Sequence, residues 1–324
     1  MKTLLIYGAT GYVGRMAAEY AVAQGMDIVI AGRSHDKLSV LSAQLDVPYR
    51  VFMPDARAAE SLEGVGMLVN LAGPFAQTAD ALMRACIKVG VDYLDITAEI
   101  NVYRLAERLG AEAAESGVML LPGVGWDVVP TDCLAVHVAR RVQDPQSLSI
   151  ALQVAGSMSR GSALSVSEII GAGLLARIDG QLVLTPDAQP RHFDFGDGLE
   201  LCAPLSFGDL VTGWHSTGIP NIAMFVHFSG DPFQGDLSQL PEGPDAQQRE
   251  AHRARAVAEV TGADGTVARS VIETVNGYTY TPIAAVEAAR RVLSGERRPG
   301  FETPAKLLGV GFAERIAGTT ITDR

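Results

Sequence analysis

Three glycines near the N-terminus are spaced so that backbone can approach a bound phosphate group. They lie three residues apart, after the apolar run 4–7 and before a helical pattern. A glycine turn between a strand and a helix leaves room for a pyrophosphate, and the first N–H groups of the helix bind its charge. A glycine turn that binds nothing has the same pattern. If a dinucleotide binds here, we expect its pyrophosphate to lie against the turn formed by Gly8, Gly11 and Gly14.

The end of the next predicted strand indicates which dinucleotide would bind. Residues 27–31 form that strand, and Gly32, Arg33 and Ser34 follow it. Sites for NAD usually place an acidic residue here to bind the ribose, and none is present. A guanidinium and a hydroxyl suit the 2′-phosphate of NADP(H) instead. In the alternative interpretation, Arg33 is a solvated surface residue and Ser34 is the N-cap of a helix over 36–45.

Strands and helices alternate through the first part of the chain. After the first two strands, the pattern predicts strands over 49–53, 67–70, 91–94 and 118–121, with helices over 36–45, 56–63, 78–89 and 101–116. Repeated strand–helix units with short connections are typical of an α/β fold with a doubly wound parallel sheet, the Rossmann arrangement. Ligands of such sheets bind beyond the carboxyl ends of the strands.

Residues that follow the later strands are therefore further candidates for ligand contact. Asp55 follows the third strand, where it could approach an adenine or cap a helix. The polar residues of 95–99 follow the fifth strand and could face the ligand, while Thr97 or Glu99 could equally cap the next helix. The loop after the fourth strand either lines the ribose and nicotinamide or is a plain turn, and its residues are Ala72, Gly73, Pro74 and Phe75.

The pattern changes after Gly123, where a glycine-rich turn enters a predicted helix over 130–142. Beyond it we predict strands over 147–154, 210–214, 223–228 and 267–275, helices over 163–176, 251–260 and 282–293, and a loop over 231–248. This order predicts two domains. Residues 1–123 with 282–324 form the dinucleotide-binding domain, and residues 124–281 form an inserted α+β domain with a mixed sheet.

The inserted domain contains the candidates for acid–base chemistry and substrate binding. Asp127 in the glycine-rich turn and His215 in the predicted strand are possible proton donors. Asp127 could instead cap the helix at 130, and His215 could be structural. Trp126 could cover an apolar substrate or fill the domain junction. Arg160 precedes a serine-rich helix entry suited to an anion, although Ser165 and Glu168, which have capping-box spacing, could simply cap this helix.

The composition of the chain argues against several classes of binding partner. The net charge is −11 and no basic block is present, so we expect neither nucleic acid nor an anionic membrane as a partner. No apolar run has the length of a membrane span, and we see no leader pattern, so we expect a cytoplasmic protein. The cysteines Cys86, Cys133 and Cys202 have no metal-binding or disulfide spacing, and we expect no metal.

Motifs along most of the chain resemble the saccharopine dehydrogenase-like oxidoreductases, a family that includes trans-acting enoyl reductases. The similar segments are GATGYVG, AGRS, NLAGPF, ACIKVGVDYLDITAE, GVGWDVVPTD, RGSALSVSE, HSTGIPN and GFETPAKLLG. The resemblance implies an NADP-binding Rossmann domain, a second domain with a mixed sheet, and a homodimer. It places the 2′-phosphate contact at Arg33 and Ser34 and the nicotinamide wall at 72–75. The residues that match the family's phosphate loop are Gly8, Thr10, Gly11, Tyr12, Val13 and Gly14.

These patterns together favour an enzyme that uses NADP(H) over a protein that only binds it. Residues 124–281 offer few basic side chains to hold an amino-dicarboxylate, so we do not expect saccharopine itself as the substrate. We expect an NADP(H)-dependent oxidoreductase that transfers a hydride to or from a C=N or an activated C=C of a small or lipid-like molecule. The alternative is a non-catalytic redox sensor that binds NADP(H).

Overall fold

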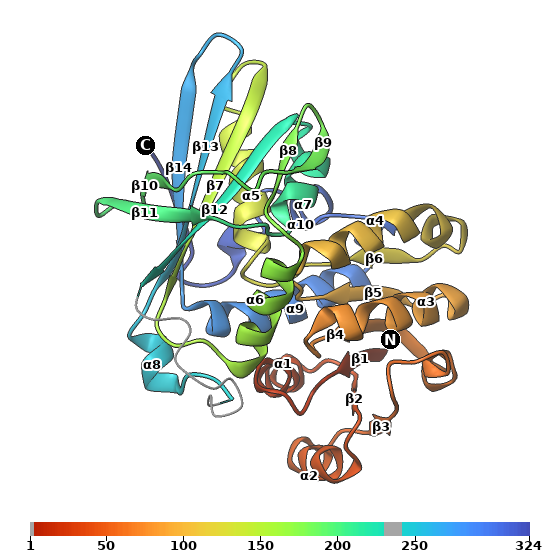
Figure 1. Cartoon of the computed structure of the whole chain (residues 1–324). Coiled ribbons are helices and arrows are strands. Elements are labelled where there is room, and N and C mark those ends of the chain that lie inside the picture. The colour runs from red at the N-terminus through yellow and green to blue at the C-terminus, as the bar shows by residue number, and fades with distance from the viewer. Residues whose placement is uncertain (1–2, 230–241) are drawn as a thin grey trace. The chain divides into compact units, whose positions relative to one another are not determined.

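The computed structural model describes residues 3–229 and 242–324, so most of the predicted loop 231–248 lies outside the described residues. The chain forms two compact units, and most of their helices and strands are labelled in Figure 1. Unit 1 comprises residues 1–97, 101–125 and 281–302, and unit 2 comprises residues 98–100, 126–280 and 303–324. Residues 303–324, which we expected in the first domain, group with unit 2.

Unit 1 is built on a parallel seven-stranded sheet with the order β15-β6-β5-β4-β1-β2-β3. The order 3-2-1-4-5-6 within it is that of a dinucleotide-binding sheet, which confirms the predicted doubly wound α/β fold. The strands are β1 (Thr3–Tyr7), β2 (Ile28–Gly32), β3 (Tyr49–Val51), β4 (Val65–Asn70), β5 (Asp92–Asp95), β6 (Met119–Leu121) and β15 (Gly300–Phe301).

The helices of unit 1 follow the strands as expected, with two differences. They are α1 (Tyr12–Ala23), α2 (His35–Leu45), α3 (Ala79–Val89), most of α4 (Ile100–Glu115) and most of α9 (Gly277–Leu293), with short 3-10 turns η1 (Ala58–Ser61) and η2 (Phe75–Gln77). The predicted helix over 56–63 is only the turn η1. Helix α9 begins at Gly277 and contains Pro282, whereas the sequence predicted its start at that proline.

Unit 2 contains a mixed nine-stranded sheet, as expected of the second domain. Its main path is β10-β11-β12-β7-β13-β14-β16, and the hairpin β8–β9 pairs with β12. Strands β7 and β12 are parallel, and the other pairs are antiparallel. The strands are β7 (Pro145–Ala155), β8 (Leu175–Ile178), β9 (Gln181–Leu184), β10 (Arg191–Asp194), β11 (Leu199–Pro204), β12 (Asn221–Ser229), β13 (Ala254–Gly262), β14 (Val267–Thr274) and β16 (Thr320–Asp323).

The helices of unit 2 include α5, which contacts the strands β7, β13 and β14 and the helices α7 and α10. They are α5 (Val129–Ala139), α6 (Arg160–Gly171), α7 (Asp209–Thr217), α8 (Ala246–Glu250) and α10 (Pro304–Leu308), with the 3-10 turn η4 (Ala313–Arg315). A separate apolar cluster on the sheet includes Phe193, Phe195, Phe225, Val257 and Val271. None of the helices in residues 3–229 and 242–324 has both the length and the hydrophobicity needed to cross a bilayer.

Two sequence predictions in unit 2 were wrong. The predicted strand over 210–214 is helix α7, which begins after Gly208 and ends at Gly218 in the left-handed region. The predicted helix over 251–260 is strand β13, preceded by the short helix α8. Alanine favours helix, but β13 pairs along its length with β7 and β14, and this tertiary pairing overrides the local propensity.

Candidate functional site

The glycine turn between β1 and α1 forms a phosphate cradle, meaning a concave stretch of backbone at Gly8–Gly14 that side chains in place of Gly8 and Gly14 would fill. A Cβ on Gly14 would lie 2.1 Å from the carbonyl oxygen of Gly8, and a Cβ on Gly8 would lie 2.8 Å from Ala72. Gly8 also has a φ of +84°, in the region that favours glycine. Gly11 is the N-cap of α1 and contributes no capping side chain, so a phosphate can take that place at the helix N-terminus. This shape fits the pyrophosphate of a dinucleotide.

The residues after β2 divide into one with a structural role and one available for a ligand. Ser34 caps α2, since its hydroxyl accepts from the backbone N–H of Lys37 at 3.5 Å. Arg33 is exposed and makes no hydrogen bond or ion pair with any described residue. A guanidinium that stands unpaired at this end of β2 suits a 2′-phosphate. The capping interpretation of Ser34 therefore holds, and the phosphate contact of both residues stays a prediction.

Asp55 also has a local partner. Its carboxylate oxygen Oδ1 accepts from the backbone N–H of Arg57 at 2.8 Å, just before the turn η1. This bond closes a local turn and is not a helix cap, because the N-cap of η1 is Arg57 and no side chain caps it. An approach of Asp55 to the adenine stays a prediction.

The loop that we expected beside the nicotinamide is held by residues that sequence reasoning missed. The Asn70 side chain accepts from the N–H of Ala72 at 3.0 Å and donates to Thr78 at 2.9 Å. Thr78 donates in turn to the carbonyl of Ala72 at 2.9 Å. The Gly73–Pro74 peptide is cis, and Phe75 is buried at the start of η2. The side chains of Asn70 and Thr78 thus hydrogen-bond to the backbone of Ala72 in this loop at the end of β4.

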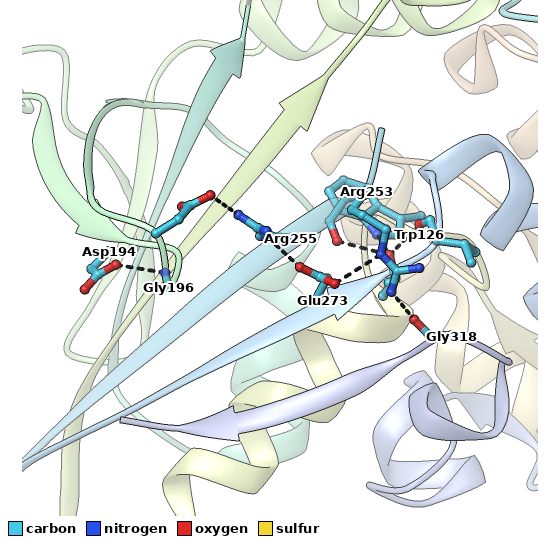
Figure 2. Close-up of polar contacts among 11 residues, drawn as sticks. Trp126, Asp194, Gly196, Arg253, Arg255, Glu273 and Gly318 are labelled. Carbon is cyan, nitrogen blue, oxygen red and sulfur yellow. Dashed lines mark hydrogen bonds and ion pairs between the residues drawn. The ribbon is translucent and has the colours of Figure 1, made fainter. Parts of the chain in front are cut away.

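Trp126 occupies an interior position of unit 2. Its indole Nε1 donates to the Thr274 hydroxyl at 2.9 Å, and a Cβ on Gly277 would lie 3.3 Å from the ring. Figure 2 draws Trp126 together with Arg253 and Arg255, which pair with Glu273 at 3.1 Å and 2.7 Å. These contacts support the packing interpretation of Trp126, and a contact with substrate stays a prediction.

Asp127 does not cap helix α5. The N-cap is Val128, without a side-chain hydrogen bond, and Asp127 contributes only its carbonyl, which accepts from the Thr131 hydroxyl at 3.1 Å. Burial raises the pKa of the Asp127 carboxyl to about 6. A carboxyl that titrates near neutral pH can deliver a proton under ordinary conditions.

His215 lies in the last turn of α7 and not in a strand. Desolvation raises the pKa of Asp132, a fully buried residue of α5, and hydrogen bonds from neighbouring groups and the nearby His215 partly offset this rise. Asp209, at the start of α7, is equally buried, and both desolvation and the charge of Asp132 hold its pKa well above the usual range. Sequence reasoning missed this carboxyl pair, although an Asp inside the apolar pattern of α5 was a signal.

Each carboxyl of the pair has one bonded oxygen. Asp209 Oδ2 accepts from the Thr131 hydroxyl at 3.0 Å, and Asp132 Oδ2 accepts from the N–H of Ala305 at 2.8 Å. The two Oδ1 atoms have no hydrogen-bond partner in the part of the chain that the structure describes. Burial of two adjacent carboxyls favours the neutral form of one of them.

We expect Asp209→Asn to remove part of the pH dependence of folding stability. Unfolded Asp ionises near pH 4, whereas folded Asp209 keeps its proton to higher pH. Stability therefore falls as pH rises between these two pKa values, by up to about 1.4 kcal/mol per pH unit. Denaturant unfolding from pH 4 to pH 8 should show the variant gaining stability relative to wild type as pH rises. Asp187→Asn, at an exposed position of unit 2, is the control, and a constant difference across this pH range would contradict the expectation.

The helix entry at Arg160 differs from expectation in its cap. Ser159 is the N-cap of α6 and accepts from the N–H of Ser162 at 3.1 Å. The capping pair that we expected from Ser165 and Glu168 is wrong, because Ser165 is buried and donates to Glu99 at 2.8 Å. Arg160 is exposed at the first helical position, and a substrate contact there stays a prediction. Among the described residues, no group of three His, Cys, Asp or Glu side chains is placed to hold a metal ion.

Comparisons with known proteins find similarity over parts of the chain. Residues 4–121 match the saccharopine dehydrogenase NADP-binding domain. A putative trans-acting enoyl reductase of Mycobacterium tuberculosis is 28% identical over 183 residues, which are 52% of this chain and 44% of that protein. A trans-acting enoyl reductase of Mycobacterium bovis is 29% identical over 148 residues, 43% of this chain and 35% of that protein. The matches thus span less than half the length of these relatives.

The fold has a solved counterpart along the whole chain. Apo saccharopine dehydrogenase (L-Glu forming) from Saccharomyces cerevisiae superposes with a TM-score of 0.68 and covers 100% of this chain and 99% of its own. The sequence identity is 13%, so this likeness shows the fold alone. GenD2 from gentamicin A biosynthesis, solved in complex with NAD, has a TM-score of 0.50 at 14% identity and covers 100% of this chain and 96% of its own.

Proposed function

We propose, from the premise that residues 4–121 belong to the saccharopine dehydrogenase NADP-binding domain family, that the protein is an NADP(H)-dependent oxidoreductase acting on a C=N or an activated C=C. The observation that carries the proposal is the glycine cradle at Gly8 and Gly14, with Arg33 after β2, which has no partner among residues 3–229 and 242–324. Bound NADPH supplies the hydride for such a reduction. The protein must then orient the substrate and provide one proton.

Asp127 is the proton donor that we favour. Strand β6 ends at Leu121, and the chain continues in unit 1 as far as Gly125. Asp127 lies two residues after Gly125, so it follows the carboxyl end of a strand of the dinucleotide-binding sheet. Its pKa of about 6 suits proton transfer near neutral pH, and its carboxyl is not used as a helix cap. His215 remains the alternative donor.

We expect the reduction to slow as pH rises above about 6, because only protonated Asp127 can donate. Asp127→Asn should lower kcat by about 10²- to 10⁴-fold and remove this limb of the pH profile. NADPH oxidation across pH 5 to 8 measures both effects. His215→Gln is the matched control and should keep the limb. If the fall in rate above about pH 6 persists in Asp127→Asn and disappears in His215→Gln, His215 is the proton donor.

The substrate class that we propose is small or lipid-like with few charges. The relatives carry the name enoyl reductase, which favours an activated C=C. Arg177, a buried cation of unit 2, binds the carbonyls of Leu210 and Gly180 at 2.7 Å and 2.6 Å and stacks on Trp214. This guanidinium is thus engaged within the fold, which argues against an amino-dicarboxylate. A panel of enones, enals and cyclic imines with NADPH tests the class.

We also propose a homodimer and a cytoplasmic location, both from the sequence resemblance and composition. Light scattering on the purified protein tests the first. A mass of one chain of 34.2 kDa would contradict it.

A further inference from the structure

Strands β10 and β11 form an arm, residues 191–202, that is joined to the sheet of unit 2 near one end. Within the arm, the residues of β10 pair with those of β11. Of the described strand pairings, those between β11 and β12 involve only Ala203 and Pro204. His227 of β12 adds a bond to the carbonyl of Leu201 at 3.1 Å. Figure 1 shows β10 and β11 running across the direction of β13 and β14.

The contacts of Arg191 place the arm over one face of the sheet. Its guanidinium donates to the Ser149 hydroxyl of β7 at 2.8 Å and pairs with Glu259 of β13. Three strands, β11, β12 and β7, lie between β10 and β13 in the strand order. In a flat sheet this order would place β10 and β13 about 19 Å apart, which is farther than an arginine side chain reaches. The arm therefore folds over the face that carries Ser149 and Glu259, which are paired residues of β7 and β13.

An apolar cluster lies between the arm and the sheet. Phe193 and Phe195 of the arm are each 1% exposed, and the ring of Phe193 lies 5.0 Å from that of Phe225 on β12. Cys202 of the arm is completely buried in the same cluster. The members that the sheet contributes are Ala151, Phe225, Val257 and Val271. Burial of these side chains favours the position in which the arm lies on the sheet.

Ion pairs hold the arm at both ends. Arg191 pairs with Glu259 at its start, and Asp197, in the turn between β10 and β11, pairs with Arg255 of β13. Arg255 also pairs with Glu273 of β14 at 2.7 Å (Figure 2). The side chains of Arg191 and Asp197 are 43% and 59% exposed, so dissolved salt can screen both pairs.

The outer side of the arm is open to solvent in the described part of the chain. Leu199 and Leu201 are 69% and 53% exposed, and His192 is exposed as well. The contacts described for the arm therefore lie on its inner side and at its junction with β12. Loss of the inner contacts would let the arm lift about Ala203 and Pro204 while its own pairing stays intact.

We infer that the arm is a salt-sensitive lid over the apolar cluster of unit 2. When it is closed, Phe193 and Phe195 lie on the sheet. Screening of the ion pairs at both ends removes part of the attraction, so a higher ionic strength increases the fraction of molecules in which the arm is lifted. Ionic strength then sets how much apolar surface unit 2 presents to solvent. The inference concerns unit 2 alone, and it goes beyond the proposed function because it requires neither NADP(H) nor a substrate.

Cys202 is a native reporter of the lid, because its thiol is covered while the arm is closed. Alkylation of the full chain with N-ethylmaleimide, followed by peptide mass spectrometry, gives a rate at each cysteine. We expect the rate at Cys202 to rise about 3- to 10-fold between about 0.05 M and 1 M NaCl, because screening weakens two partly exposed ion pairs. Cys133, a fully buried cysteine of α5, is the internal control and should keep its rate.

Asp197→Asn removes one of the two ion pairs. It should raise the rate at Cys202 in low salt by about two- to fivefold and reduce the response to salt. Asp187→Asn is the matched control, because it removes the same charge at an exposed position four residues before the arm. This control should react as wild type does.

A rate at Cys202 that does not respond to salt would overturn the inference. Parallel changes at Cys202 and Cys133 would also overturn it, since they indicate loosening of unit 2 as a whole, and so would equal effects of the two variants. If Asp197→Asn does not fold, wild type decides: a salt response at Cys202 without one at Cys133 supports the lid, and any other result contradicts it.

Discussion

Replacing Arg33 with alanine is expected to weaken NADPH binding by about 10- to 100-fold and to leave NADH binding within about twofold. The guanidinium is exposed and unpaired among the described residues, so it reaches a 2′-phosphate without first breaking another contact. A charge-assisted hydrogen bond contributes about 1.5–3 kcal/mol, and 1.4 kcal/mol is tenfold in affinity. NADH lacks the 2′-phosphate, so its affinity does not depend on this contact with Arg33. Calorimetry with both dinucleotides measures the change in preference.

Arg84→Ala is the control for this experiment. Arg84 is an exposed arginine of unit 1 that pairs with Asp80 on helix α3, so its removal changes the net charge equally. It should leave both affinities unchanged. Equal weakening of NADPH and NADH by Arg33→Ala would contradict a 2′-phosphate contact, and so would a similar loss in the Arg84 variant.

The second large effect is expected from Gly14→Ala. The added Cβ would lie 2.1 Å from the carbonyl oxygen of Gly8 and 2.8 Å from its carbon, so backbone must move. Overpacking of this kind typically costs about 1–3 kcal/mol of stability, and here it also deforms the phosphate cradle. We expect NADPH affinity to fall by more than about 100-fold, with a lower unfolding temperature.

Gly171→Ala provides the comparison, since a Cβ at that helix position would meet nothing within 4 Å. This variant should bind NADPH as wild type does and unfold at the same or a slightly higher temperature. Normal NADPH binding by Gly14→Ala, with unchanged stability, would show that the turn is not a phosphate cradle.

The parts of the site that the sequence predicted are those encoded by neighbouring residues. The glycine turn and the strand end at Arg33 follow from local spacing, and the doubly wound sheet follows from repeated strand–helix alternation. The structure confirms the turn, the end of β2 and the sheet, because the local sequence pattern and the pairing between strands favour the same structure in this part of the chain. The contacts of this turn with a cofactor remain predictions.

What the sequence missed depends on partners far apart in the chain. The Asp95 carboxylate meets Gly123, and the Asp209 carboxyl meets Thr131, only after the strands and helices assemble. The same holds for β13, whose alanine-rich composition favours helix until β7 and β14 pair with it. Helix α7 was mistaken for a strand because β-branched and aromatic residues dominate 211–214, and its limits at Gly208 and Gly218 were not recognised.

The central claim is hydride transfer from bound NADPH to an organic acceptor. The most direct test is to incubate the protein with NADPH carrying deuterium at C4 of the nicotinamide and the panel of enones, enals and imines, and to analyse the products by mass spectrometry. We predict deuterium in one reduced product, with catalysis lost in Gly14→Ala and strongly slowed in Asp127→Asn. Tight NADPH binding with no labelled product across the panel would contradict the claim and favour a redox sensor that binds the cofactor without turnover.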